Sequence, residues 1–555
     1  MTKLIFAPAS TTRIRHSAER PLGHPRGDAA GHHERVSEPA IEIDRPQRPT
    51  QSPPSGRPPE PGVRTRGPWL VAAATTVTLL LLAGRYGYHR DELYFLLAGR
   101  HLDWGYVDQG PLVPALARLL DTIAPGNLVV LRTPSAVLAG GAVLLVAAIA
   151  RELGAGRGGQ LFAAVLAALS GIVLASGHLL STTTVDLLVW LVAVWCAVRL
   201  LRTGDSRWAL GIGLALGVGM LSKLLPALLA VGLVAGVLIA GPRRLLRDRW
   251  VLAAAGITVL LAAPNLIWQA ANGFPQLGVA ASISDGDSSY SGRRDAFTLQ
   301  FVIISPYAVP IWIAGLVTLL RRPEWRAYRA VGWAWVVVVG IVLIAGGKGY
   351  YDAPLLLVLT AAGTLVTVAW ASRGSLWWRR GLLALGVVPF LLPNVVLLLP
   401  VLPADRLPGF VVDVNYDAGE TIGWPEFADS VARVHRGLPP EERSRAVILT
   451  ANYGEAGALA RYGPARDLPR AYSGHNSMAD FGRPPADADV VIAVGWVGGE
   501  PGDPLDAWFE RCTLSGVVDQ RVEVDNDENG GPIHVCRGLR RPWSQIWDTE
   551  VRHTG

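Results

Sequence analysis

Long apolar runs separated by short polar gaps dominate the chain between residues 68 and 402. A helix of about 20 apolar residues crosses the roughly 30 Å of hydrocarbon in a bilayer. The pattern therefore predicts an α-helical polytopic membrane protein with about eleven transmembrane helices. The runs that predict these helices are 68–84, 128–150, 160–178, 183–201, 208–222, 224–241, 251–269, 297–320, 330–347, 353–371 and 381–402.

The polar gaps between these runs fall into two alternating sets, which differ in charge. One set is basic throughout and reads RELGAGRGG, RLLRTGDSRW, GPRRLLRDRW, RRPEWRAYR and SRGSLWWRR. The other set, which includes residues 85–127, holds most of the isolated carboxylates. Basic loops stay on the cytoplasmic side of a membrane. The pattern predicts a multi-pass protein of the cytoplasmic membrane, with residues 85–127 and the C-terminus on the outer face.

Both ends of the chain differ from the apolar middle, which gives three predicted parts. Residues 1–66 are rich in Pro, Arg and His and predict a disordered cytoplasmic tail. Residues 67–402 form the transmembrane domain. Residues 403–555 contain short apolar stretches such as AVILT, VVIAV, RVEVDN and PIHVCRG, which predict the strands of an extracytoplasmic α/β domain.

Composition narrows the class further. The chain has 50% hydrophobic and 17% charged residues, with a net charge of +6. Because the basic residues of the middle part lie in the gaps between apolar runs, the charge indicates membrane orientation and no nucleic-acid partner. Of the three cysteines, Cys196 lies in an apolar run, and Cys512 and Cys536 are able to pair only outside the cytoplasm.

Ionisable and polar residues recur at the outer ends of several predicted helices. Such groups are costly at membrane depth, so their repeated placement at one face predicts a shared polar cavity. A solvated outer loop is the alternative for the first of them, and helix capping, snorkelling lysines or an interfacial aromatic belt would also explain individual residues. The candidates are Asp91, Glu92, Asp108, His178, Asp186, Lys223, Arg293, Lys348, Tyr350 and Tyr351.

A cavity that is half in lipid and half in water suits a polyprenyl-phosphate sugar. Transfer of the sugar to an acceptor hydroxyl needs a base, for which Asp91 is the candidate, and cations that hold the departing phosphate. Lys223, Lys348 and Arg293 or Arg294 are candidates for the second role. Because a lipid monophosphate leaves, this chemistry admits a divalent cation but does not require one, and no metal ligands are assigned.

The motifs that surround these residues resemble those of a known family. They read RDELYF, GYVDQGPLVPALARL, STTTVDLLVW, LSKLLPALLA, APNLIWQAANGFPQL and GGKGYYDAPLLLVLTAAG. The layout resembles the GT-C glycosyltransferases, specifically glycosyltransferase family 39 and the protein O-mannosyltransferase-like group that includes the lipid A aminoarabinose transferase. The resemblance covers roughly residues 67–402.

The resemblance implies an inverting hexosyl or pentosyl transfer from a polyprenyl-phosphate sugar to a protein, glycan or lipid acceptor at the outer face. It places the family's acidic first-loop residue on Asp91, with Glu92 beside it, and a second acidic position on Asp186. Phosphate-contacting lysines correspond to Lys223 and Lys348. Some relatives carry Lys-Pro in the second half of the first loop, where this chain reads Asp108, Gln109, Gly110 and Pro111, so that phosphate contact is replaced or absent.

Two other functions are consistent with many apolar runs. A transporter of a polar or lipid-linked substrate is the main alternative, although transporters show two similar halves and charges near the bilayer midplane. A membrane scaffold whose outer domain binds a polymer is the other, although two or three spans would anchor it.

Residues 270–296, rich in Gly, Ser and Asp, predict a mobile flap over the site.

Overall fold

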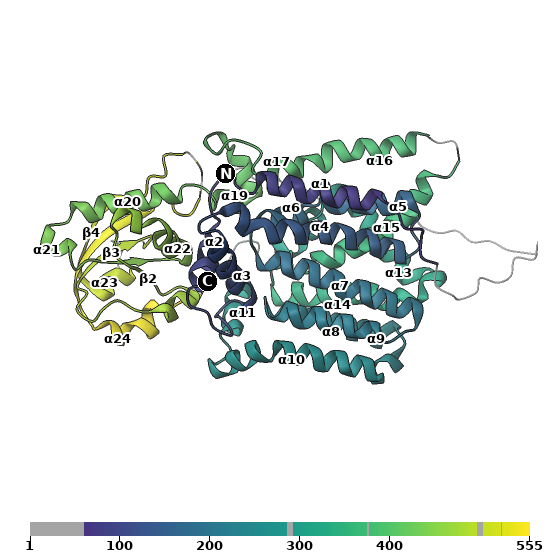
Figure 1. The fold of residues 1–555 in the computed structure, drawn as a ribbon, viewed down its shortest axis with the longest axis horizontal. Helices are drawn as coiled ribbons and strands as arrows, with labels where there is room; N and C mark the ends of the chain where they lie inside the picture. The colour runs from purple at the N-terminus through teal and green to yellow at the C-terminus, as the bar shows by residue number, and fades with distance from the viewer. Residues whose placement is uncertain are drawn as a thin grey trace, which may run out of the picture. The chain divides into compact units, whose positions relative to one another are not determined.

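Helices form almost all of the described residues between 67 and 398 in the computed structural model, and they lie side by side (Figure 1). The structure describes residues 60–285, 292–374, 377–496, 503–522, 524 and 526–554. All of the described residues belong to one compact unit. The helices of this part are α1 (Gly67–Leu82), α2 (Arg90–Ala98), α3 (Leu112–Ile123), α4 (Leu128–Glu152), α5 (Arg157–Ala168), α6 (Gly171–His178), α7 (Thr182–Thr203), α8 (Trp208–Met220), α9 (Pro226–Ala240), α10 (Arg249–Ala271), α11 (Pro275–Asp285), α12 (Arg293–Val302), α13 (Val309–Arg321), α14 (Arg329–Ala345), α15 (Ala353–Ala371), α16 (Trp377–Phe390) and α17 (Leu392–Leu398).

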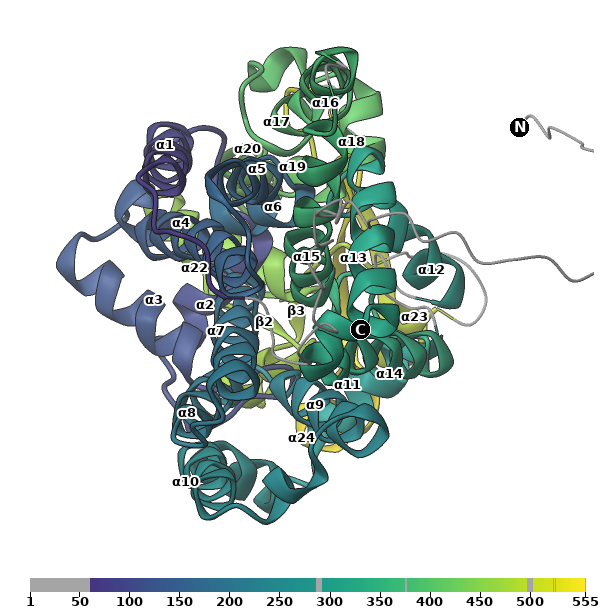
Figure 2. The same ribbon diagram turned by 90° about the vertical axis from the view of Figure 1, so that its right-hand side faces the viewer.

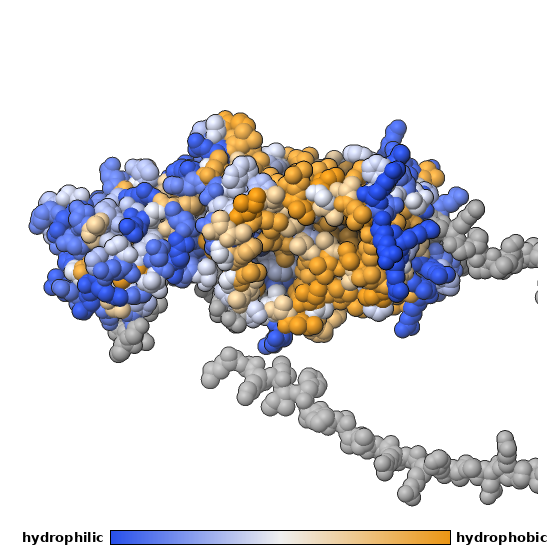
Figure 3. All heavy atoms as spheres, turned by 90° about the horizontal axis from the view of Figure 1, so that it is seen from below, coloured by the Kyte–Doolittle hydropathy of each residue, from blue (hydrophilic) through white to orange (hydrophobic). Residues whose placement is uncertain are grey.

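Length and composition support a membrane protein. Among the described residues, six helices are long and apolar enough to cross a membrane, or up to eight if each of two bent helix pairs counts as one span. Three further predicted spans correspond to the shorter apolar helices α1, α8 and α9. Apolar side chains form a band over the helices, with hydrophilic side chains on both sides of it (Figure 3). The number eleven stays a prediction.

The interior of the helical part is built around α15. Every residue of this helix from Ala353 to Thr364 is buried. It packs against α4, α5, α7 and α13 (Figure 2). At its crossing with α13 the backbones approach closely, since a Cβ on Gly363 would lie 1.9 Å from the Ile311 carbonyl oxygen. Small residues that allow such approach are typical of helix packing in membranes.

Two of the predicted spans are broken at the same place. The run 160–178 bends by 54° between α5 and α6, and the run 297–320 bends by 77° between α12 and α13. The breaks satisfy each other's backbone groups, because the Gly171 and Ile172 amides donate to the Ile304 and Ile303 carbonyls, both at 3.0 Å. Irregular backbone at membrane depth needs such partners. Asn394 of α17 completes the junction with bonds to the carbonyls of Leu169 at 2.8 Å and Ile304 at 3.0 Å.

The C-terminal part contains a five-stranded mixed sheet of order β2-β1-β3-β5-β4. β1 pairs in parallel with β2 and β3, while β5 runs antiparallel to β3 and β4. A disulfide between Cys512 and Cys536 joins β4 to β5. The elements used below are α18 (Gly409–Val414), α19 (Tyr416–Gly419), α20 (Trp424–Gly437), β1 (Val447–Thr450), α22 (Tyr453–Tyr462), β2 (Ala471–Ser473), β3 (Val490–Val494), β4 (Phe509–Val517) and β5 (Pro532–Leu539).

Several details differ from the sequence-based expectations. The strand predicted at 521–526 lies partly outside the described residues, and its described residues are not in a strand. Residues 1–59 of the predicted tail also lie outside them. The last residues before α1 are bound to the helices, because Gly62 exchanges backbone and side-chain hydrogen bonds with Arg151. Much of the predicted flap is helical, in α11 and the start of α12, and residues 286–291 lie outside the described part.

The junction between the broken helices gives a test of this arrangement. We expect Asn394→Ala to lower the free energy of unfolding by about 1–3 kcal/mol, because the carbonyls of Leu169 and Ile304 lose a partly buried donor. Thermal unfolding in detergent measures this. Asn272→Ala is the control, since the Asn272 amide bonds the Trp268 carbonyl at an exposed position. Equal effects of the two substitutions would contradict the role given to Asn394.

Candidate active site

The start of α2 sets the direction of its first side chains. His89 caps the helix: its Nδ1 accepts from the Asp91 amide at 3.2 Å, and its own amide donates to Glu92 Oε2 at 2.9 Å. This is a capping box with histidine in the capping position. Asp91 is the second residue of the helix, so its carboxylate is not the cap. The capping alternative for Asp91 is therefore wrong.

Glu92 is fully buried and forms an ion pair with Arg132 of α4. Arg132 Nε and Nη2 donate to the two carboxylate oxygens of Glu92 at 2.9 and 2.8 Å, and the Leu180 amide donates to Oε1 at 2.9 Å. The other Arg132 hydrogens reach the carbonyls of Ala83 at 2.9 Å and Gly87 at 2.7 Å. Unlike Asp91, Glu92 is not among the residues that line the cavity described below. The prediction of a catalytic Glu92 is corrected to a positioning role, because its oxygens are occupied by donors.

Asp91 has a different environment from its neighbour. Its Oδ1 accepts a hydrogen bond of 2.8 Å from the Tyr453 hydroxyl, which belongs to the first residue of α22. Two glycines of α22 allow this contact, because a Cβ on Gly454 or Gly457 would lie 2.7 Å from Arg90 Cβ or 2.8 Å from Leu93 Cβ. The close packing of α22 on α2 thus brings the C-terminal part of the chain to Asp91.

Asp91 lies at one end of a cavity of about 430 Å³, called here the amphiphilic cavity. Its polar end is formed by His89, Arg90, Asp91, Lys348, Tyr350, Asp417 and Tyr453. The other walls are mainly apolar, and the broken helices contribute Gly171, Ile172, Ile303 and Pro306. The cavity therefore fits a ligand with a charged head and a hydrocarbon tail.

The charges at the polar end act on one another. Burial, together with the charge of Lys223, lowers the pKa of Lys348 to about 8, although the charges of Asp91 and Asp417 act to raise it. For His89, burial favours the neutral ring, but the hydrogen bond to Asp417 and the charges of Asp91 and Asp417 outweigh burial and raise its pKa. His89 Nε2 lies 3.5 Å from Asp417 Oδ1.

A second group of predicted residues adjoins the cavity. Lys223 Nζ lies 5.4 Å from the centre of the Tyr351 ring, and its charge interacts with those of Asp186 and Asp108. Asp108 accepts a 2.8 Å hydrogen bond from Tyr94, and burial raises its pKa to about 6. Tyr350 connects this group to the cavity, since its ring packs against Tyr351 at 5.2 Å between centroids. The structure thus brings Asp91 and both lysines to the same region.

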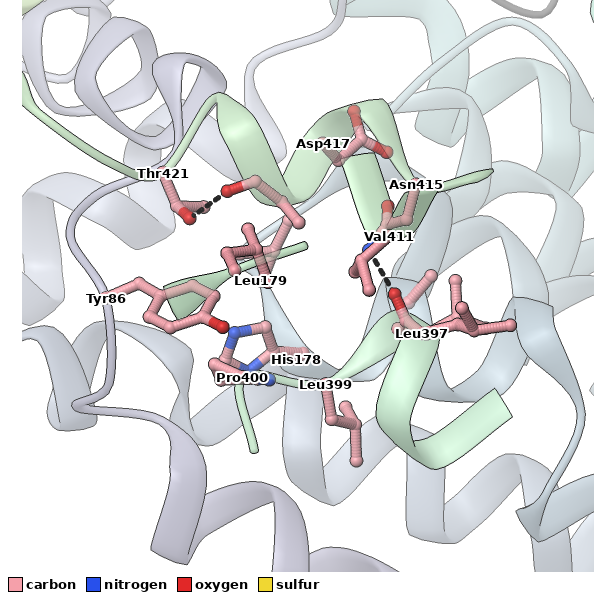
Figure 4. A pocket seen from close by; sticks show the side chains of 14 residues that line it. Tyr86, His178, Leu179, Leu397, Leu399, Pro400, Val411, Asn415, Asp417 and Thr421 are labelled. Atoms are coloured by element: carbon pink, nitrogen blue, oxygen red, sulfur yellow. Dashed lines mark hydrogen bonds between the residues drawn. The ribbon is translucent and has the colours of Figure 1, made fainter. Parts of the chain in front are cut away.

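Two predicted substrate-binding residues lie elsewhere. Arg293 is exposed and donates to the Ile344 carbonyl at 3.3 Å, outside the amphiphilic cavity. His178 points into a separate pocket of about 30 Å³ beside Tyr86 and Pro400 (Figure 4). Its Nδ1 has no hydrogen-bond partner among the described residues. This pocket adjoins the amphiphilic cavity, because the two share six lining residues, namely Ala175, Leu179, Leu397, Leu398, Asn415 and Asp417.

The sequence reasoning missed several residues of the site. Arg132 had a signal, because a lone arginine in an apolar run marks a buried partner. Arg90 stands inside the RDELYF motif and contacts Tyr416 at 3.1 Å and Glu420 at 3.5 Å. Asp417 and Tyr453 lie more than 300 residues after Asp91 and had no local signal. Among the described residues, no group of three or more His, Cys, Asp or Glu side chains is arranged to hold a metal ion.

Comparison with known proteins supports the predicted fold and, over part of the chain, the predicted family resemblance. Residues 108–268 match the family described as dolichyl-phosphate-mannose-protein mannosyltransferase. ArnT from Cupriavidus metallidurans in the apo state is 15% identical, with a TM-score of 0.53 over 84% of this chain and 97% of that chain. The structure of the same protein bound to undecaprenyl phosphate is also 15% identical, with a TM-score of 0.50 over 85% of this chain and 98% of that chain. No curated protein matches the chain. The predicted GT-C resemblance is confirmed, and the chain has the GT-C fold.

Substitutions in the Glu92–Arg132 ion pair test whether Glu92 positions α2. We expect Glu92→Gln to lower the free energy of unfolding by about 3–5 kcal/mol, because the buried Arg132 charge loses its partner. The double variant Glu92→Leu, Arg132→Met removes both charges, so we expect it to lose less stability than Glu92→Gln. Unfolding in detergent measures both.

Asp91→Asn is the matched control for the charge change and should unfold near the temperature of the unsubstituted protein. If Glu92→Gln keeps its unfolding temperature, the ion pair does not position α2 as described.

Proposed function

We propose that the protein transfers a sugar from a polyprenyl-phosphate-linked donor to an acceptor hydroxyl, with inversion and with Asp91 as the base. The carrying observation is that Asp91 and Lys348 share the polar end of a cavity whose other walls are mainly apolar. A carboxylate and a cation at the head of a lipid-sized cavity match a donor with a phosphate head and a hydrocarbon tail.

The proposed step is a single displacement. Asp91 removes the proton of the acceptor hydroxyl, whose oxygen forms a bond to the anomeric carbon of the sugar. The bond between that carbon and the phosphate oxygen breaks, and its electron pair stays on the phosphate, which leaves as the lipid monophosphate. Attack from the opposite face inverts the anomeric centre. Lys348 and Arg90 stabilise the phosphate charge, and no step is assigned to a metal ion.

The Tyr453 hydroxyl supports the assignment of Asp91. It donates to Asp91 Oδ1 at 2.8 Å, which is the geometry that an acceptor hydroxyl needs for proton transfer. In the proposed reaction the acceptor hydroxyl takes this position. Glu92 is not available for this role, because its oxygens already accept from Arg132 and from backbone amides.

The nature of the donor also has support from the comparisons. ArnT, which has the same fold, is the structure determined with undecaprenyl phosphate. The matched family is described by a dolichyl-phosphate sugar donor. Both are polyprenyl phosphates. The shared fold and the lack of a two-fold repeat in the sequence favour transfer over the transporter alternative. The sugar, hexosyl or pentosyl, and the acceptor, protein, glycan or lipid, are not assigned.

We place the site on the outer face of the cytoplasmic membrane. Helix α4 begins beside the site, where Arg132 binds Glu92, and ends in the basic gap at Arg151. Helix α7 likewise begins near the cavity and has Arg202 in its last turn. Since basic loops stay cytoplasmic, the site lies on the opposite face. The Cys512–Cys536 disulfide is consistent with an oxidising compartment around the sheet.

Asp91→Asn tests the base. Asparagine keeps the size of the side chain but does not accept the proton, so we expect turnover to fall by about 10²–10⁴-fold. Purified protein is incubated with a panel of radiolabelled polyprenyl-phosphate sugars, and label that leaves the lipid for an acceptor is measured. Donor binding and unfolding temperature should stay near those of the unsubstituted protein.

Asp205→Asn is the matched control, because Asp205 is exposed in a basic gap at the far end of α7. Transfer at the normal rate by Asp91→Asn would remove Asp91 from the reaction.

Lys348 gives the proposal a pH dependence. Its pKa of about 8 means that the ammonium form, which binds phosphate, is lost as the pH rises through 8. We therefore expect the affinity for polyprenyl phosphate to be highest below pH 8. Above it, affinity falls by up to about tenfold per pH unit. The phosphate itself ionises near pH 6 and stays doubly charged in this range.

Lys348→Arg is the control, since arginine keeps its charge throughout this range and should give a flat profile. Lys348→Met should bind weakly at every pH. Calorimetric titration across the pH range measures all three proteins. A pH profile that is the same for Lys348→Arg and the unsubstituted protein would contradict the phosphate contact.

A further inference from the structure

A second cavity, of about 400 Å³, lies between the end of α2 and the segment from α22 to the residues after β2. We call it the arginine groove and define it by Leu97, Arg100, His101, Arg470, Tyr472 and Phe481. It shares no lining residue with the amphiphilic cavity. The proposed transfer of a sugar does not use it.

The groove is positively charged at its rim. Arg100 and Arg470 are exposed, and none of the residues that line the groove is acidic. Among the described residues, no carboxylate forms an ion pair with either arginine. Burial lowers the pKa of His101, and the charges of Arg470 and Arg100 lower it further. The unpaired guanidinium groups leave planar donors that match carboxylate and phosphate oxygens.

Aromatic rings form one wall of the groove, and one of them packs against the Arg470 guanidinium. The His101 ring stacks on Phe481 with 4.6 Å between centroids and 7° between planes. The Arg470 guanidinium lies 5.0 Å from the centre of the Tyr472 ring and donates to the Phe481 carbonyl. The apolar faces of sugar rings pack on such surfaces, while their hydroxyls and charged groups bond to cations at the rim. The groove thus combines a stacking wall with fixed positive charge.

The groove is connected to the proposed base through α2. Leu97 follows Asp91 by six residues, or about 9 Å along the helix axis. Tyr94 lies between them and packs against Tyr453, with 4.9 Å between ring centroids and 30° between the ring planes. A molecule that reaches both places is longer than a single sugar. This separation suits an extended acceptor rather than the donor, whose cavity lies among the membrane helices.

We propose that the arginine groove is an acceptor subsite that binds an anionic segment of a saccharide away from the reacting hydroxyl. This inference rests on the proposed function, because it assigns the groove to the acceptor of that reaction. The carboxylate or phosphate groups of the saccharide bind Arg100 and Arg470, and a sugar ring packs on His101 and Phe481.

The test measures binding directly and needs no turnover. Tetragalacturonate, a carboxylated oligosaccharide, is titrated into the full-length protein in detergent, with neutral maltotetraose and inorganic phosphate as comparisons. We expect tetragalacturonate to bind, maltotetraose and phosphate to bind at least tenfold more weakly, and the double variant Arg100→Ser, Arg470→Ser to lose at least tenfold in affinity. The double variant Arg436→Ser, Arg511→Ser is the matched control, since it removes two exposed charges that lie outside the groove.

Each other outcome overturns the proposal. No binding of tetragalacturonate, or equal binding by the Arg100 and Arg470 variant, removes the groove as the subsite. If maltotetraose binds as tightly as tetragalacturonate, the groove does not select an anionic ligand. If phosphate binds as tightly as tetragalacturonate, the groove does not recognise the saccharide. Asp91→Asn should bind tetragalacturonate normally, so a failure of the proposed transfer reaction is seen separately from a failure of the groove.

Discussion

The buried ion pair between Glu92 and Arg132 fixes the geometry on which the candidate site depends. Arg132 comes from α4, and through its hydrogen bonds it holds the end of α1, the start of α2 and, by way of Glu92, the connection before α7. Successive residues of a helix point about 100° apart. Once Glu92 is fixed toward Arg132, Asp91 must point elsewhere, and here it points into the amphiphilic cavity. Two charges removed from water contribute little net stability, but they specify one arrangement, since any other leaves a buried charge unpaired.

The cavity itself exists because two membrane helices are broken at the same depth. If α5–α6 and α12–α13 were continuous helices, their backbone amides and carbonyls would bond to one another within each helix. No backbone polar group would then be exposed at a break. The bends of 54° and 77° separate the helix halves, and the freed amides of one break bond the carbonyls of the other. Glycine is needed at the contact, since a Cβ on Gly171 would lie 2.6 Å from the Ile303 carbonyl oxygen. The junction therefore supplies an apolar wall in which the amides of Gly171 and Ile172 and the carbonyls of Ile303 and Ile304 are paired with one another.

The apolar pattern of the sequence predicted the helices, and the charges of the gaps predicted the face on which polar residues gather, so the proximity of Asp91, Lys223 and Lys348 followed from the two patterns together. Charge did not distinguish Asp91 from Glu92, because their roles depend on where α2 begins, and His89 sets that point. Hydropathy did not reveal the helix breaks, because residues on both sides of Gly171 and Ile303 stay apolar. The edge strand β4 was missed since most of its residues, including the consecutive Glu510 and Arg511, are exposed, so it lacks the alternation that marks a half-buried strand. Contacts such as Tyr453 with Asp91 join distant segments and leave no local pattern.

The site divides between two parts of the chain, and this division separates its two substrates. The membrane helices supply the apolar walls, Lys348 and the broken-helix junction, which together suit the lipid donor. The C-terminal part supplies Tyr453 beside Asp91, Asp417 beside His89 and one side of the arginine groove. Under the proposed reaction, the base therefore lies at the boundary between a donor half and an acceptor half. Gly454 and Gly457 hold that boundary closed by allowing α22 to pack on α2, so the spacing of these two helices sets how an acceptor hydroxyl approaches Asp91.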